Sequence, residues 1–169
     1  MGERVDRVSG PAATHFIGVI SDTHGLVRPD VHTALAGVEL ILHAGDVGDD
    51  AILDELALIG PVLAVYGNTD APGRPRLSEV IDISIAGVSI HVSHGHEVGP
   101  PTPAKLLARY SAHVIVYGHT HRPLVVRADG RLVLNPGAAG PRRFDISPSV
   151  ARLTIRDGVA EAELIDLRA

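Results

Sequence analysis

Side chains of metal-ligating type are concentrated in five short segments of the sequence. These segments contain Asp22 and His24, then Asp46, Asn68, His94, and finally His119 and His121. The chain has no cysteine, so any metal must be held by imidazole, carboxylate or amide groups. Such a donor set suits divalent Mn, Fe, Zn, Ni or Co better than Ca²⁺ or Cu⁺, and we expect Mn. The donors outnumber the ligands of one tetrahedral ion, so we predict two divalent ions that share a bridging carboxylate.

A two-metal site indicates the hydrolysis of a phosphate ester. Paired ions activate a bridging water as hydroxide and hold the attacking and leaving oxygens during in-line displacement at phosphorus. We therefore predict an enzyme, a metal-dependent phosphoesterase that attacks its substrate with a metal-bridging hydroxide. Its expected substrate is a small phosphate ester or a nucleotide.

Each of the five segments directly follows a short apolar run that is typical of a strand. The predicted strands are 16–20, 39–42, 62–65, 88–92 and 114–117. In open α/β sheets the ligand crevice lies outside the carboxyl ends of the strands. The five polar segments are therefore expected to converge on one rim of the molecule.

The remaining elements predict an α/β fold of two sheets packed face to face with helices outside. Helices are predicted at 30–36, at 49–60 with an apolar face, and from Thr102-Pro103 onward with Leu106, Leu107 and Tyr110 buried. Three antiparallel hairpins are predicted around Ala86-Gly87, Asp129-Gly130 and Asp157-Gly158, which are two-residue turn signals. Asp49 and Asp50 are interpreted as a helix cap and not as ligands.

Composition limits the possible partners and the compartment. The 169 residues suit a single domain, with residues 15–169 as the domain and 1–14 as a flexible N-terminal extension. A net charge of -5 argues against wrapping of long nucleic acid. No apolar run is long enough to cross a membrane and no secretory signal is present, so a cytoplasmic protein without a membrane partner is expected. The sequence leaves oligomerisation open, and a homo-oligomer is compatible with it.

The chain contains five motifs in a fixed order: Asp-x-His, Gly-Asp, Gly-Asn-x-Asp, His-Gly-His and Gly-His-x-His. This order resembles that of the calcineurin-like metallophosphoesterase superfamily, and most closely that of its small bacterial and archaeal phosphodiesterases. The resemblance implies a four-layer αββα sandwich of two mixed β-sheets flanked by helices, with a dinuclear site. One ion would be held by Asp22, His24, Asp46 and His121. The other would be held by Asp46, Asn68, His94 and His119, with Asp46 bridging.

One position departs from the family pattern. Many relatives carry a histidine directly after the motif asparagine, where this chain has Thr69. The resemblance therefore supplies no general acid, and we predict that His96 or a metal-bound water takes this role. Asp46, Asn68 and His96 are the expected catalytic residues, with phosphodiesters or activated aryl phosphates as substrates. Asp70 is predicted either to orient a ligand histidine or to stabilise a turn.

Several alternatives compete with this interpretation. The same small fold resembles a retromer subunit, so a non-catalytic, metal-binding scaffold for protein interactions is the alternative function. A helical zincin motif at His96-Glu97 is excluded, because Gly99 and Pro100 follow. The other histidines are predicted to be structural or to lie at the surface; they are His15, His32, His43, His91 and His113. Arg142 and Arg143 are predicted to be solvated, and the segment 74–76 is predicted to be loop surface.

Overall fold

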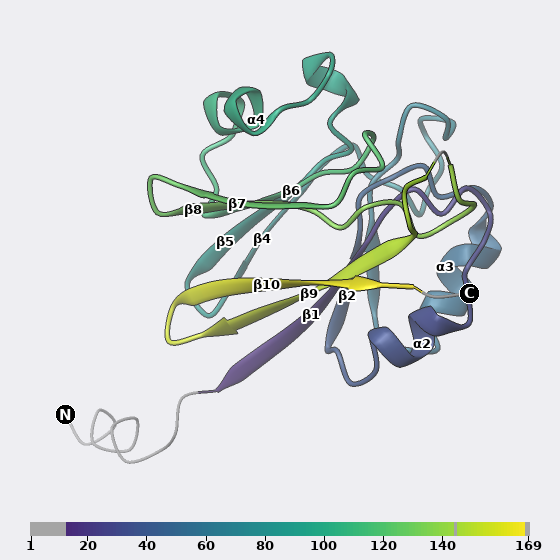
Figure 1. Cartoon of the computed structure of the whole chain (residues 1–169), viewed down its shortest axis with the longest axis horizontal. Coiled ribbons are helices and arrows are strands. Elements are labelled where there is room, and N and C mark those ends of the chain that lie inside the picture. The colour runs from purple at the N-terminus through teal and green to yellow at the C-terminus, as the bar shows by residue number, and fades with distance from the viewer. Residues whose placement is uncertain (1–12, 144, 168–169) are drawn as a thin grey trace.

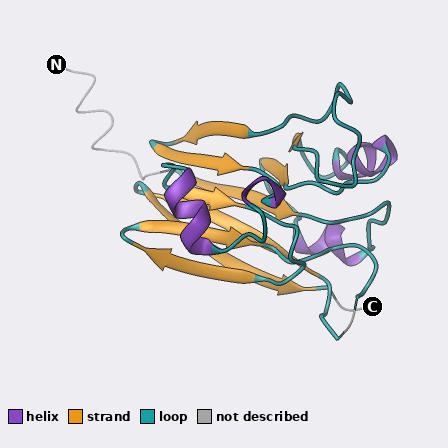
Figure 2. Ribbon diagram, turned by 90° about the horizontal axis from the view of Figure 1, so that it is seen from above, coloured by secondary structure: helices purple, strands orange, loops and turns teal. Residues whose placement is uncertain are grey.

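Two five-stranded mixed sheets pack face to face, and helices cover their outer faces (Figures 1 and 2). The computed structural model describes residues 13–143 and 145–167. The first sheet has the order β10-β9-β1-β2-β3, and the second has the order β4-β5-β6-β8-β7. In the first sheet β1, β2 and β3 are parallel, and in the second β5, β6 and β8 are parallel. The predicted four-layer sandwich is confirmed.

The bounds of the elements follow the predicted pattern closely. The first sheet consists of β1 (Thr14–Ile20), β2 (Leu40–His43), β3 (Val62–Ala64), β9 (Ser149–Arg156) and β10 (Val159–Asp166). The second consists of β4 (Ile81–Ile85), β5 (Val88–Val92), β6 (Val114–Val116), β7 (Leu124–Ala128) and β8 (Arg131–Asn135). The helices are α2 (Asp30–Ala34), α3 (Asp50–Leu56), α4 (Pro103–Arg109) and the short 3₁₀ helix η1 (His96–Val98).

Three apolar clusters separate the four layers. The largest lies between the sheets and takes Ile17 and Val19 from β1, together with Ile90 and Val92 from β5. Because side chains alternate along a strand, Ile20 of β1 points to the opposite face, where it joins a second cluster with α2 and α3. A third, smaller cluster packs α4 against the outer face of the second sheet. This packing fixes both sheets with the carboxyl ends of their parallel strands at one edge.

The three hairpin turns have the conformation that their sequences predicted. Ala86, Asp129 and Asp157 have φ angles of 49°, 53° and 54°, and each precedes a glycine that also has a positive φ. Two consecutive residues with positive φ are typical of the type I′ turn, whose twist matches that of the flanking strands. The hairpins β4–β5, β7–β8 and β9–β10 are therefore confirmed.

Some predicted boundaries are wrong by a few residues. The helices α2 and α3 end at Ala34 and Leu56, before the predicted ends at residues 36 and 60. Tyr110 lies outside α4, because its backbone is extended at φ -122° and ψ 148°. The predicted extension comprises residues 1–14, of which 1–12 lie outside the described residues. Its last residue, Thr14, belongs to β1 and not to an extension. Within the described ranges no helix is both long and apolar enough to span a membrane.

Candidate metal centre

The loops that follow β1, β2, β3, β5 and β6 bring the predicted ligands together at one rim, and two groups of donor atoms form there. In the first group, His121 Nε2 lies 3.2 Å and His24 Nε2 3.8 Å from Asp22 Oδ1. In the second group, His94 Nε2 lies 3.3 Å from Asp46 Oδ2 and 3.9 Å from Asp22 Oδ1. Each group offers ligand atoms within 4.8 Å of one another.

Asp22 belongs to both groups, and Asp46 of the second group also lies near the first. Its Oδ2 atom is 3.6 Å from His24 Nε2 on one side and 3.3 Å from His94 Nε2 on the other. The two remaining predicted ligands lie beside each other, with His119 Nδ1 at 3.1 Å from Asn68 Oδ1. The ring centroids of His94 and His119 are 5.1 Å apart, so this pair adjoins the second group.

Three of the buried donor atoms have no hydrogen-bond partner among the described residues. They are Asp22 Oδ1, His24 Nε2 and His94 Nε2. Buried polar atoms are rarely left unpaired, because an unpaired group has lost its hydration without compensation. All three atoms face the space between the carboxylates and the histidines, so a divalent cation fits this donor set.

The other atoms of these side chains are fixed by hydrogen bonds. Asp22 Oδ2 accepts bonds from Ser21 Oγ at 2.6 Å and from the backbone N–H of His119 at 3.1 Å. His94 donates its Nδ1 proton to the carbonyl oxygen of Ala44 at 2.7 Å, so its Nε2 atom presents a lone pair to the centre. Outer partners of this kind orient metal ligands before an ion arrives.

Backbone conformation at the rim is also unusual. Asp22, His24, Asp46, His119 and His121 all have positive φ angles, between 45° and 71°. The left-handed region is unfavourable for residues with a side chain, and such strain accumulates at functional sites. It persists here because the surrounding sheets and loops hold each position. We infer that the fold holds the ligands in place at a cost in stability.

Glycines allow the loops to approach Asp46 and His94. A Cβ atom at Gly67 would lie 2.1 Å from Asp46 Oδ1 and 2.5 Å from the Asp46 backbone nitrogen. A Cβ atom at Gly45 would lie 2.7 Å from His94 Nδ1. Both glycines adjoin the predicted motifs, Gly45 directly before Asp46 and Gly67 directly before Asn68. Their small size is therefore required by the geometry of the centre.

The charges at the centre favour a cation. Burial alone would raise the pKa of Asp46. The adjacent His94 and the Thr69 N–H donor lower this pKa by more than burial raises it, so the carboxylate is ionised. Burial alone would lower the pKa of His94, but the adjacent carboxylates of Asp46 and Asp22 raise it. Burial lowers the pKa values of His24 and His119, which keeps both rings neutral and able to coordinate.

Comparison with known proteins decides the family. Residues 16–158 match the calcineurin-like phosphoesterase superfamily domain. The chain belongs to the calcineurin-like phosphoesterase superfamily. A probable metallophosphoesterase from Methanocaldococcus jannaschii is 37% identical over 163 residues, which covers 91% of this chain and 82% of the relative. A phosphodiesterase from the same organism is 30% identical over 140 residues, covering 72% of this chain and 82% of the relative.

A solved structure has the same fold. Vacuolar protein sorting 29 from Cryptosporidium parvum superposes with a TM-score of 0.76 at 22% identity, covering 95% of this chain and all of that chain (100%). At 22% identity this likeness shows a common fold and nothing about function.

The Asp70 carboxylate hydrogen-bonds backbone N–H groups and not a histidine, which was one of its two predicted roles. It is buried, and its two oxygens accept hydrogen bonds from the backbone N–H groups of Val47, Gly48 and Gly67, at distances of 2.9 to 3.2 Å. Arg74 Nη1 lies 3.6 Å from the same carboxylate, and Arg74 also bonds the carbonyl oxygen of Gly48. Asp70 thus joins the loop that carries Asp46 to the loop that carries Asn68.

Two further polar side chains stabilise the loops of the candidate site. Asn135 is fully buried and donates to the carbonyl oxygen of Gly118 at 3.1 Å and to Thr120 Oγ1 at 3.0 Å, which fixes the loop of His119 and His121. His43 is also fully buried; its Nδ1 accepts from the Gly45 N–H, and its Nε2 bonds Thr23 Oγ1 at 2.9 Å. Burial lowers the pKa of His43 to about 4.

His96 lies next to the two candidate donor groups and not within them. Its ring centroid is 5.4 Å from that of His94 and 6.3 Å from that of His119. Its Nδ1 atom is buried and has no hydrogen-bond partner in the described part of the chain. Thr69 contributes its backbone N–H to Asp46 Oδ1 at 3.0 Å. The guanidinium of Arg143 is close enough to His24 to contribute to the lowering of its pKa.

The sequence reasoning missed two features of the site. Ser21 was not singled out, although its place directly before Asp22 was visible. The wider significance of His91 and Tyr110 was also missed: their rings stack, with centroids 3.7 Å apart. The sequence offered a signal for His91 only. The predicted hairpin around Ala86-Gly87 places Asp82 opposite His91, and an acid opposite a histidine predicts an ion pair. Asp49 was predicted correctly as a helix cap, since its side chain accepts from Ala51 N at 2.9 Å.

Proposed function

We propose that this protein is a metal-dependent phosphodiesterase whose centre holds two divalent ions. The observation that carries the proposal is that two groups of donor atoms adjoin each other: Asp22 belongs to both, and Asp46 Oδ2 of the second lies 3.6 Å from His24 Nε2 of the first. Three of these donor atoms are buried without a hydrogen-bond partner among the described residues. Membership of a phosphoesterase superfamily and the 30% identity to a phosphodiesterase support the reaction class.

In this proposal Asp22, His24, Asp46 and His121 hold one ion, and Asp46, Asn68, His94 and His119 hold the other. Bound divalent ions would lower the pKa of water and neutralise the negative charge of a phosphoryl group. Mn²⁺ is our first choice, and Fe, Zn, Ni and Co are compatible with the same donors.

The protein's own groups perform the remaining tasks. Ser21 and the His119 N–H keep Asp22 Oδ1 turned towards the centre, and the Thr69 N–H does the same for Asp46. His96 is the side chain placed to hydrogen-bond the phosphoryl group or to protonate the leaving oxygen, because it adjoins the rim but belongs to neither donor group. With Thr69 in place of a histidine, we expect diesters and aryl phosphates with good leaving groups to be favoured over unactivated monoesters.

A scaffold for protein interactions is the competing function. The likeness to vacuolar protein sorting 29 concerns the fold. All seven predicted ligands are present in this chain, and the described geometry brings their side chains to one rim. We therefore favour catalysis.

Metal-stripped protein reconstituted with Mn, Zn, Ni or Mg should be assayed on a chromogenic phosphodiester and on the matching monoester. We expect metal-dependent cleavage of the diester, and its loss in Asp22→Asn and His94→Gln. His32→Gln is a matched control, because His32 lies on α2, pairs with Glu55 and belongs to neither donor group. Metal binding without turnover of either ester would instead favour the scaffold.

His96→Ala separates the proposed acid from the ligands. We expect this variant to bind metal as the wild type does, and to lose more activity on an alkyl diester than on an aryl diester. An aryl leaving group needs little protonation, whereas an alkoxide needs a proton. Equal rates for wild type and variant on both diesters would contradict the role of His96.

A further inference from the structure

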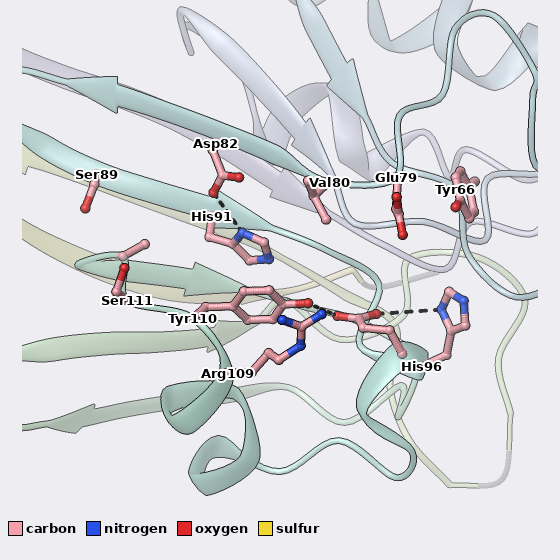
Figure 3. A pocket seen from close by; sticks show the side chains of 12 residues that line it. Tyr66, Glu79, Val80, Asp82, Ser89, His91, His96, Arg109, Tyr110 and Ser111 are labelled. Atoms are coloured by element: carbon pink, nitrogen blue, oxygen red, sulfur yellow. Dashed lines mark hydrogen bonds and ion pairs between the residues drawn. The ribbon is translucent and has the colours of Figure 1, made fainter.

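A pocket on the outer face of the second sheet begins beside the metal centre and has no assigned role (Figure 3). Its volume is about 610 Å³, which lies within the range of sites for small molecules. His96 and Tyr66 line one end of it, and Ser89 and Ser111 line the other. Since the ring of His96 also lies 5.4 Å from that of His94 and 6.3 Å from that of His119, this end of the pocket lies beside the place where a phosphate would be held.

The His91 ring provides an unsatisfied hydrogen-bonding atom in the pocket wall. Its side chain is only 3% exposed, and its Nδ1 atom lies 2.8 Å from Asp82 Oδ1. Its Nε2 atom has no hydrogen-bond partner among the described residues and points into the pocket in Figure 3. Because Nδ1 faces a carboxylate it carries the proton, so Nε2 is an acceptor that a donor group of a ligand would satisfy.

The charged groups around the pocket are predominantly acidic. Glu79, Asp82 and Glu97 line it, and Arg109 is the cation among the lining residues. Glu97 is held in place by the Tyr110 hydroxyl at 2.7 Å and by the Gly95 N–H at 3.0 Å. Glu79 is exposed and has no ion pair in the described structure. A ligand that carries positive charge therefore suits the pocket better than an anionic one.

An aromatic ring adds to this preference. Tyr66 lines the end nearest the metal centre, whereas the Tyr110 ring is already stacked on His91 and lies 5.3 Å from the Arg109 guanidinium carbon. The face of a tyrosine ring attracts a cation electrostatically, and quaternary ammonium groups are bound in this way.

We propose that this pocket binds the alcohol portion of a phosphodiester substrate and selects an alcohol that carries an ammonium group. The inference rests on the proposed function, because it places the phosphate at the metal centre and one ester substituent beyond His96. Glu79 and Asp82 would attract the charge of a primary or a quaternary ammonium group, and His91 Nε2 would in addition accept a hydrogen bond from the N–H of a primary one.

Two diesters with the same leaving group test the selection. One is p-nitrophenyl phosphorylcholine, and the other is the neohexyl analogue, in which carbon replaces the quaternary nitrogen. Shape and leaving group are then equal, and only the charge differs. We expect kcat/KM to be about fivefold higher for the choline ester at low salt, with the ratio falling at high salt because the carboxylates are near the surface.

The double variant Glu79→Gln/Asp82→Asn should bring this ratio close to one, because the pocket then lacks the carboxylates that distinguish the choline ester from the neohexyl ester. The control is Glu161→Gln/Asp54→Asn, which removes the same charges from exposed positions outside the pocket. A ratio near one in the wild type, or an unchanged ratio in the pocket variant, would overturn the inference while leaving the phosphodiesterase proposal intact.

A binding experiment keeps the two proposals separable. In metal-free protein, we expect p-nitrophenyl phosphorylcholine to shift the amide NMR signals of Tyr110, Ser111 and Ala112, and the pocket variant to abolish these shifts. If neither diester is hydrolysed with any metal, the proposed function fails and the NMR result alone decides the pocket. Absence of shifts at these amides, or shifts that persist in the pocket variant, would overturn the inference.

Discussion

Replacing Asp70 by asparagine is expected to damage both stability and metal binding, although Asp70 lies in neither donor group. Both carboxylate oxygens accept backbone N–H groups, from Val47 and Gly48 on one loop and from Gly67 on the other. An asparagine keeps one of these oxygens and turns an NH₂ group towards an N–H donor. At least one charge-assisted bond is lost, and one buried donor is left unpaired.

The size of the effect follows from these bonds. A hydrogen bond to a charged group contributes ~1.5–3 kcal/mol, and an unsatisfied buried donor costs a similar amount. We therefore expect Asp70→Asn to lower the free energy of unfolding by about 3 kcal/mol. Because the two loops carry Asp46 and Asn68, metal affinity should fall by about 10- to 100-fold, as for other residues that orient ligands.

Urea unfolding of metal-free protein measures the stability, and titration of the folded variant with Mn²⁺ or Zn²⁺ measures the affinity. Asp54→Asn is the control, since Asp54 is an exposed partner of Arg76, and surface pairs contribute ~0–1 kcal/mol. If Asp70→Asn matched the wild type in both measurements, the role of Asp70 in joining the two loops would be refuted.

Three further predictions concern the rim. Gly67→Ala places a Cβ against the Asp46 backbone, so metal affinity should fall by at least tenfold in a metal titration. Gly37→Ala is the control: it has open space around it and a positive φ, so it should lose about 1 kcal/mol of stability and no metal affinity. Burial lowers the pKa of His43 to about 4 in the folded protein, so the buried ring is neutral. Its contribution to the free energy of unfolding is therefore complete above about pH 6.5, and about 3 kcal/mol is lost as the pH falls towards 4. In metal-free protein, His43→Gln should flatten the pH dependence of the unfolding free energy in this window, and an unchanged slope would contradict the assignment. Asn135→Ala should cost about 2 kcal/mol in urea unfolding, because the Gly118 carbonyl and Thr120 lose their donor; unchanged stability would argue against this function of Asn135.

Much of the fold could be predicted because local signals and packing agree. Strand alternation in β1 sends Ile17 and Val19 to one face and Ile20 to the other, and the apolar clusters use both faces. The hairpin turns follow from residue pairs such as Asp157-Gly158, which tolerate positive φ. The ends of helices were less predictable, because the apolar period of α3 continues to Ile59 although the helix ends at Leu56.

The candidate site could be predicted in composition but not in its supporting contacts. Side chains that follow parallel strands of one sheet converge at one edge, so the closeness of Asp22, Asp46 and His94 could be predicted. The partners of Asp70 are backbone N–H groups, which every residue carries, so no sequence pattern distinguishes them. The pocket near His91 arises from a stacking partner, Tyr110, that lies beyond the end of α4 and depends on tertiary packing.

The most direct test of the central claim is the number of metal ions that each chain retains after loading and gel filtration, measured by elemental analysis beside the hydrolysis of a phosphodiester. Two ions per wild-type chain are predicted, with Asp46→Ala retaining at most one and losing activity, because Asp46 Oδ2 lies near both His24 and His94 and is the proposed bridging ligand. Retention of both ions by Asp46→Ala, or full diester hydrolysis by a chain that holds no metal, would contradict the shared two-metal centre.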